Sequence, residues 1–109
     1  MRVLFDNGTP RGVAAALAEH VVEEARGRGW DALQNGLLLD AAEAAGFDVF
    51  VTTDRRLRYQ QNLAGRRIAV IVLSKARWRW IKAALPAIAG AVASATPGAF
   101  VEVEIPKPT

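Results

Sequence analysis

The sequence contains no cysteine, and this absence excludes several kinds of site. Disulfide bonds, thiolate metal centres and a cysteine nucleophile are impossible, and a chain without them suits a reducing compartment. The N-terminus has no basic segment followed by an apolar run, so no signal peptide is expected. The longest apolar stretch, residues 83–95, is interrupted by Pro86, Gly90 and Ser94 and is too short to span a bilayer. We therefore expect a cytoplasmic protein without a membrane segment.

The motifs of several large enzyme classes are also missing. The sequence has no GxGxxG, no phosphate-binding P-loop, no GxSxG and no HExxH. Nucleotide cofactors, serine hydrolysis and zinc protease chemistry therefore have no support. The single histidine, His20, stands at the start of a short apolar run and is expected to be structural.

Acidic residues are absent from one long part of the sequence. Residues 55–101 contain nine Lys or Arg and no acid, a formal charge of +9, whereas residues 1–54 contain nine acids and four bases, a formal charge of −5. One interpretation is that the two halves neutralise each other across the fold. The other is that they form a carboxylate pocket beside a basic surface that binds phosphates.

What the sequence does contain is a regular alternation of strand and helix patterns. Apolar runs predict strands at residues 2–6, 20–24, 48–53, 68–73 and 100–105. Helical spacing predicts helices at residues 10–19, 35–45, 57–63 and 75–95. We expect Thr9 and Ser74 to cap the first and last helices, Pro86 to kink the last one, and Trp78 to lie in its buried stripe.

This alternation predicts one α/β domain over residues 1–109. Its central sheet is expected to be mainly parallel, with four to five strands and helices on both faces, because strand–helix–strand units form right-handed crossovers. In such sheets ligands bind beyond the carboxyl ends of the strands, where the strand order reverses. Residues that directly follow a strand are therefore the first candidates for a site.

Two of the predicted strands end on an acid, Asp6 and Asp54. Neighbouring strands lie about 4.8 Å apart, so the two carboxylates converge if their strands are adjacent. Close carboxylates repel each other unless a cation lies between them, and Mg²⁺ or Mn²⁺ prefers such oxygen ligands. The alternative is that both residues initiate turns, as Asp often does after a strand. The charge split favours the metal site.

Other polar residues near these acids are candidate ligands of a nucleic acid. Three arginines follow Asp54 and suit RNA phosphates, namely Arg55, Arg56 and Arg58. The remaining candidate substrate ligands are Asn7, Arg11, Gln60 and Gln61, although a polar helix face also explains the two glutamines. Trp80 stands in a basic stretch, where it either stacks on a base or fills a partner interface.

The segment "GFDVFVTTDRRLRYQQNL" at residues 46–63, with the opening "LFDNGTP" and the Asn35-Gly36 pair, resembles the small PIN-like protein family. The resemblance covers nearly the whole chain. It implies a PIN-like α/β fold and an Mg²⁺- or Mn²⁺-dependent ribonuclease, related to PIN-domain ribonucleases and to the toxins of toxin–antitoxin pairs. Asp6 and Asp54 match the acidic-site positions of the family. RNA, an antitoxin protein and a second copy of the chain, as a homodimer, are the expected partners.

The chain departs from the family's pattern at two positions. Family members carry an acid directly after the first Asp, where this chain has Asn7. They read Asn-Gly-Glu where this chain has Leu37 after the glycine. Asp40 lies about one helical turn after Leu37 and either partly replaces the missing acid or is a solvated helix residue.

The sequence therefore predicts a metal-dependent endoribonuclease, a hydrolase of the toxin type, with Asp6, Asp54 and Asp40 as its catalytic acids. One alternative is a catalytically weakened relative that binds nucleic acid or a protein partner, supported by the two missing acids. Another is a receiver-like signalling domain with a phosphorylated Asp. Lys75 fits that domain loosely, whereas Asn7 breaks its acidic pair.

Overall fold

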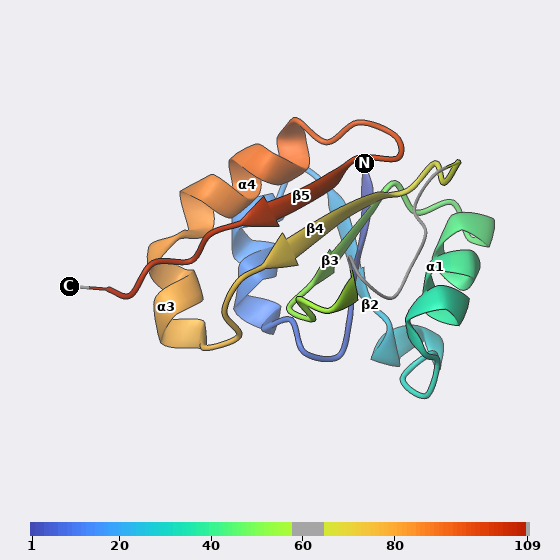
Figure 1. Cartoon of the computed structure of the whole chain (residues 1–109), viewed down its shortest axis with the longest axis horizontal. Coiled ribbons are helices and arrows are strands. Elements are labelled where there is room, and N and C mark those ends of the chain that lie inside the picture. The colour runs from blue at the N-terminus through green and yellow to red at the C-terminus, as the bar shows by residue number, and fades with distance from the viewer. Residues whose placement is uncertain (58–64, 109) are drawn as a thin grey trace.

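The computed structural model describes residues 1–57 and 65–108, and strands alternate with helices along them (Figure 1). The strands are β1 (Arg2–Phe5), β2 (Val21–Glu24), β3 (Val49–Thr52), β4 (Ala69–Leu73) and β5 (Phe100–Val103). All five strands predicted from the sequence are thus confirmed, each with slightly shorter bounds. The helical elements are η1 (Arg11–Leu17), η2 (Arg26–Arg28), α1 (Asn35–Ala44), α3 (Trp78–Ala83) and α4 (Leu85–Ala93).

The five strands form one sheet in the order β2-β1-β3-β4-β5, and every neighbouring pair is parallel. The order reverses between β1 and β3, because the chain leaves β1 for one side of the sheet and then crosses to the other. In the β1–β3 register Phe5 lies opposite Val51. The prediction that the two acid-ended strands are neighbours is therefore confirmed, and their carboxyl ends meet at the switch point where α/β sheets bind ligands.

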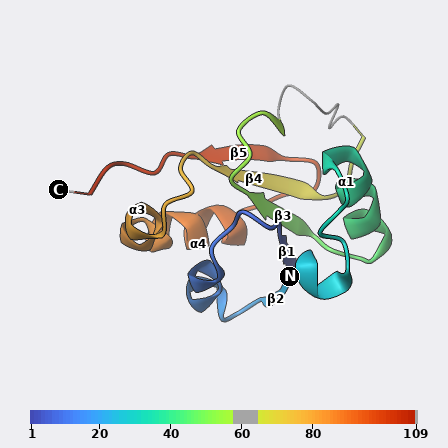
Figure 2. The same ribbon diagram turned by 90° about the horizontal axis from the view of Figure 1, so that it is seen from below.

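Helices cover both faces of the sheet (Figure 2). Val3 and Phe5 pack with η1, α3 and α4, whereas Leu4 packs with α1, because successive side chains of a strand point to opposite faces. All residues of β3 and β4 are buried, as expected for central strands of a parallel sheet. The predicted three-layer α/β architecture is confirmed, with a sheet that is parallel throughout.

The first helix differs from its prediction in type and in its cap. It is a 3-10 helix, and its N-cap position is Pro10 in an extended conformation, with no side-chain cap. The expectation that Thr9 caps it is wrong. The Thr9 side chain is 4% exposed, and its hydroxyl lies within hydrogen-bond distance of the Asp6 carboxylate and the Val51 carbonyl. The Thr9 hydroxyl therefore contacts the Asp6 carboxylate and does not cap the helix.

The long helix predicted at residues 75–95 is two helices, α3 and α4, separated at Ala84. Pro86 lies in the first turn of α4, where its missing N–H has no helical partner to lose. It therefore begins a second helix instead of kinking a continuous one. Ser74 is not the cap of α3, because its hydroxyl accepts the N–H of Ile105 (2.7 Å) and the N-cap is Arg77.

Trp78 is 40% exposed and does not join the buried stripe that the sequence pattern predicts. It is the first residue of α3, and its indole lies against Gly12 of η1. A Cβ atom on Gly12 would stand 2.2 Å from the nearest ring carbon. The helix predicted at residues 57–63 lies largely outside the described residues.

The contact between Gly12 and Trp78 leads to a stability prediction. Gly12→Ala should lower the free energy of unfolding by about 1–3 kcal/mol, because the added methyl group forces the indole to move. Gly27→Ala is the matched control, since nothing lies within 4 Å of a Cβ there, and it should be neutral or stabilising by about 0.5 kcal/mol. Urea unfolding of both variants measures the difference. Equal stabilities would contradict the packing of Trp78 on Gly12.

Within residues 1–57 and 65–108, the helices are all too short or too polar to cross a membrane. This finding agrees with the expectation of a chain without a membrane segment.

Candidate functional site

Asp6 leaves the sheet at the carboxyl end of β1 and is fixed there by its backbone. Its N–H donates to the Val51 carbonyl of β3 (3.2 Å). The preceding residue, Phe5, accepts the N–H of Ala25, just beyond β2 (2.8 Å). Because both neighbouring strands hold this point of the chain, the Asp6 side chain starts from a rigid position between them.

Two buried threonines orient the Asp6 carboxylate. Thr9 Oγ1 lies 2.6 Å from Asp6 Oδ1, and Thr52 Oγ1 donates to Asp6 Oδ2 over 2.5 Å. The residues are 4% and 1% exposed, respectively. A carboxylate has about four lone-pair directions, so two hydroxyl donors leave each of its oxygens able to accept another hydrogen bond or a cation.

Asp54 follows β3 by two residues and lies at the same edge of the sheet. Its N–H donates to Thr52 Oγ1 (3.0 Å), the hydroxyl that donates to Asp6. Its Oδ1 accepts the backbone N–H of Arg56 (3.0 Å) and the Nε of the same residue (3.2 Å). The structure thus brings the two predicted acids to one edge and links them through Thr52. The side chain of Asp54 also initiates a turn, as the simpler alternative expected.

A cleft of about 220 Å³ opens beside Asp6, between the carboxyl ends of β1 and β2. Two of the predicted substrate ligands, Asn7 and Arg11, line it. Asn7 Nδ2 donates to the carbonyl of Asp31 (3.0 Å). The other lining residues are Gly8, Thr9, Pro10, Glu24 and Arg26. The cleft therefore presents two carboxylates, Asp6 and Glu24, and two guanidinium groups, Arg11 and Arg26.

Glu24 is a site residue that the sequence reasoning missed. It is the last residue of β2 and lies opposite Phe5, so it is a third acid at a strand end. Its Oε1 accepts the Nε of Arg11 over 3.0 Å. The neighbouring Glu23 points to the other face, where hydrogen bonding to Arg28 lowers the pKa of its carboxyl. The "VVEE" run ends on an acid, and an acid also follows β1 and β3 within two residues, so this signal identifies Glu24.

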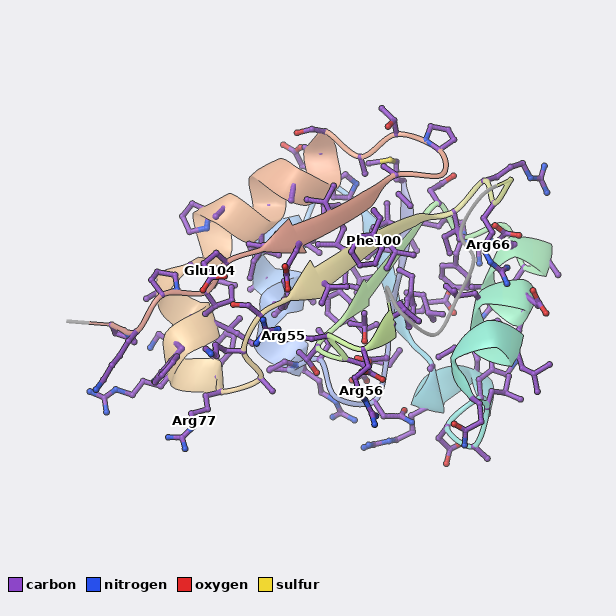
Figure 3. All side chains as sticks on the ribbon, viewed as in Figure 1. Arg55, Arg56, Arg66, Arg77, Phe100 and Glu104 are labelled. Atoms are coloured by element: carbon purple, nitrogen blue, oxygen red, sulfur yellow. The ribbon has the colours of Figure 1, made fainter. Side chains whose placement is uncertain are left out.

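Asp40, the third predicted acid, lies near the amino ends of the strands and not with Asp6 and Asp54. Its Oδ1 pairs with Arg66 Nη1 at 2.9 Å, and Arg66 also pairs with Glu43 at 3.6 Å. Arg66 precedes β4, so it belongs to the amino end of the strands, away from Arg56 (Figure 3). Because α1 begins on the side of the carboxyl ends and runs back along the sheet, successive turns carry its residues away from Asp6. None of the contacts made by the described residues joins Asp40 to Asp6 or Asp54.

Two of the three arginines predicted to bind phosphates near Asp54 are described by the structure, and both form ion pairs. Arg55 pairs with Glu102 of β5 (3.5 Å), and Arg56 pairs with Asp54 (3.2 Å). The pairs of Arg56 with Asp54 and of Arg66 with Asp40 and Glu43 join residues 55–101 to residues 1–54, in agreement with the interpretation that these halves neutralise each other in part, whereas Glu102 lies outside both halves. The other predicted substrate ligands in this stretch, Arg58, Gln60 and Gln61, lie outside the described residues.

The donor set around Asp6 fits a hydrated hard cation. Mg²⁺ is bound in proteins through about one or two carboxylates and keeps several waters, and Asp6 offers an oriented carboxylate with free lone pairs. Within residues 1–57 and 65–108, no group of three or more acids and histidines is placed to hold an ion. An ion at Asp6 would therefore have one or two carboxylate ligands and water in the rest of its shell.

Comparison with protein-family models, with curated proteins and with solved structures gives no match for this chain. The PIN-like resemblance therefore stays a prediction from the sequence motifs. A function for this chain has to be inferred from the geometry and chemistry of the site.

Proposed function

We propose that this chain is a metal-dependent endoribonuclease of the PIN-like type, with Asp6 as the principal ligand of Mg²⁺ or Mn²⁺. The observation that supports it is the placement of Asp6: a carboxylate fixed at the β1–β3 switch point, oriented by two buried hydroxyls and open to a cleft. A rigid acceptor at this position suits a cation better than a solvated turn residue does, because its geometry is set before the ligand arrives.

The residues of the cleft have distinct roles in this proposal. Thr9 and Thr52 hold the carboxylate of Asp6 as an acceptor in one orientation. Arg11, whose side chain is 75% exposed, can exchange its ion pair with Glu24 for a substrate phosphate. Arg26 lines the same cleft and adds positive charge. A metal bound at Asp6 would supply Lewis-acid activation of a water for attack on the phosphodiester.

The resemblance to the small PIN-like protein family also supports a proposal about the location and partners of this chain. We propose a cytoplasmic toxin that an antitoxin protein controls, with a homodimer as a further assembly. Asp54 contributes a second carboxylate in this proposal, provided that the cation displaces Arg56 from its Oδ1.

A second candidate is a relative that binds nucleic acid or a partner protein without turnover. Two observations favour it: Asp54 Oδ1 is paired with Arg56, and Asp40 is paired with Arg66. Two of the three expected acids are thus engaged by arginine side chains. Such a protein would bind RNA and leave it uncut with either metal.

The structure gives less support to the receiver-like signalling domain than to the nuclease. The strand order 2-1-3-4-5 agrees with that class of doubly wound sheet. Lys75, however, lies with its Nζ 6.0 Å from the centre of the Trp80 ring, and the Asn7 amide is bonded to Asp31. Neither residue is directed to an acid by these contacts, so we keep the nuclease as the proposal.

Metal removal tests the proposed function directly. A labelled single-stranded RNA should be cleaved with Mn²⁺ or Mg²⁺ and left intact with EDTA, and excess Mn²⁺ should restore cleavage. The wild-type chain and the variant Asp6→Asn, purified in the same way, control for contaminating nucleases. Cleavage that continues in EDTA, or none with either metal, would contradict the proposal.

A further inference from the structure

Four basic residues on and before α3 form a surface that we call the α3 basic surface, made of Lys75, Arg77, Arg79 and Lys82. All four residues are exposed. Within residues 1–57 and 65–108, no acid pairs with any of them, in contrast to Arg55, Arg56 and Arg66. The neutralisation seen elsewhere between the two halves of the chain therefore does not extend to α3, where the positive charge stays available to a ligand.

Trp80 lies close to two of these cations. Lys75 Nζ lies 6.0 Å and Arg77 Cζ 5.9 Å from the centre of its ring. The indole is partly buried and packs against the core formed with η1 and α4. The ring attracts a cation that lies over it, so Trp80 favours positions of Lys75 and Arg77 close to the start of α3.

Trp78 connects this surface to the Asp6 cleft. Trp78 is 40% exposed, its indole lies against Gly12, and Arg11, the residue before Gly12, lines the cleft. η1 and α3 contact each other, and both follow the carboxyl ends of their strands (Figure 1). Arg77 projects away from α3 on the side of the molecule where Arg56 lies (Figure 3). Trp78 thus lies between α3, which carries two of the basic residues, and η1, which carries Arg11 of the cleft.

We propose that these residues form a track for single-stranded RNA, which leads from the α3 basic surface over Trp78 into the Asp6 cleft. It rests on the proposed function for the reaction at the cleft, but not for binding. The cations match the phosphates of a nucleic acid, and an exposed indole stacks on the face of an unpaired base. A duplex hides those faces, so single strands are the ligand that the combination fits.

Binding in EDTA tests the charged part of the track without cleavage. Arg77→Gln should weaken binding of a labelled single-stranded RNA roughly threefold, the effect of one exposed ion pair. Arg77→Gln/Arg79→Gln should lower the slope of log affinity against log salt by about 1.4, because each phosphate contact contributes about 0.7 on single strands. Arg67→Gln is the matched control, an exposed arginine before β4 at the opposite edge, and should change neither quantity.

Tryptophan fluorescence tests the stacking part. RNA should quench the emission of the wild-type chain, and Trp78→Phe should remove most of that quenching and weaken binding. Trp30→Phe is the control, because Trp30 packs edge-on against Phe47 on the α1 face. Urea unfolding of both variants verifies that they fold. Equal quenching in Trp78→Phe and wild type would overturn the role of Trp78.

The outcomes separate this inference from the proposed function. If the wild type binds single-stranded RNA as described but never cuts it, the nuclease proposal fails and the track stands. If it cuts RNA while Arg77→Gln/Arg79→Gln binds like wild type with the same salt slope, the track is overturned and the nuclease stands. Equal competition by duplex RNA, or better competition by polyglutamate, would overturn single-stranded RNA as the ligand, and polyglutamate would indicate an acidic protein.

Discussion

Asp6→Asn is expected to lower metal-dependent RNA cleavage at least about 100-fold and to leave the chain folded. Loss of a residue that only supports a metal ligand already costs about 10–100-fold, and Asp6 is the proposed ligand itself. The fold should survive because the hydroxyl of Thr9 can donate to the Val51 carbonyl, 3.0 Å away, instead of to Asp6. Initial cleavage rates at saturating Mn²⁺, with urea unfolding of the same sample, measure both effects.

Two carboxylate-to-amide variants control for this experiment. Asp31→Asn makes the same change of charge at an exposed residue near the cleft, whose carbonyl binds Asn7, and should cut RNA like wild type. Asp40→Asn removes the ion pair with Arg66 and should lower stability by about 0.2–1 kcal/mol without loss of activity. Undiminished cleavage by Asp6→Asn, or an equal loss in Asp31→Asn, would remove Asp6 from the mechanism.

Thr52→Val separates orientation of the carboxylate from its presence. The variant keeps Asp6 but removes its hydroxyl donor and the acceptor of the Asp54 N–H. We expect a loss of activity smaller than that of Asp6→Asn, and a lower metal affinity at unchanged RNA affinity in EDTA. This split identifies Thr52 as a positioning residue for the metal and not as an RNA ligand.

The strands and their arrangement could be predicted because the signals are local and strong. The run "IAVIVL" at residues 68–73 is apolar throughout, and such a run is typical of a strand that is buried on both faces. The adjacency of β1 and β3 followed from a functional argument, since two acids at strand ends are useful together when their strands are neighbours. The first prediction rests on a local pattern of the sequence, whereas the second concerns strands about 46 residues apart and needed the two acids as its signal.

Other features depended on the folded geometry and on partners far away in the sequence. Thr9 suits a helix cap and a carboxylate equally well, and its position beside Asp6, three residues away, and the distant Val51 carbonyl decides between them. The role of Asp40 depended on where Arg66 lies, which sequence spacing along one helix cannot give. Glu24 could have been found from the sequence, because it ends a predicted strand at residues 20–24 and Asp6 ends the predicted strand at residues 2–6.

Leu37→Glu is expected to tighten Mn²⁺ binding roughly tenfold and to raise RNA cleavage, because added carboxylate charge strengthens a site for a hard cation. The position tolerates the change: Leu37 is 61% exposed and lies in the first turn of α1. An acid near a helix N-terminus is favourable by about 0.3–1 kcal/mol, so stability should not fall. Leu37→Gln is the matched control, with a similar size and no charge, and isothermal titration with Mn²⁺ compares the two.

Asn7→Glu, the other acid that the family resemblance implies, should be less well tolerated. Its amide donates to the Asp31 carbonyl over 3.0 Å, and a carboxylate cannot, so we expect a loss of about 1 kcal/mol in unfolding free energy. The double variant Asn7→Glu/Leu37→Glu then tests what the missing acids mean. If it cleaves RNA with Mn²⁺ while the wild type does not, the natural chain is the non-catalytic relative. If Leu37→Glu and Leu37→Gln bind Mn²⁺ equally, this turn of α1 does not reach the Asp6 site, and the missing acid at Leu37 says nothing about catalysis.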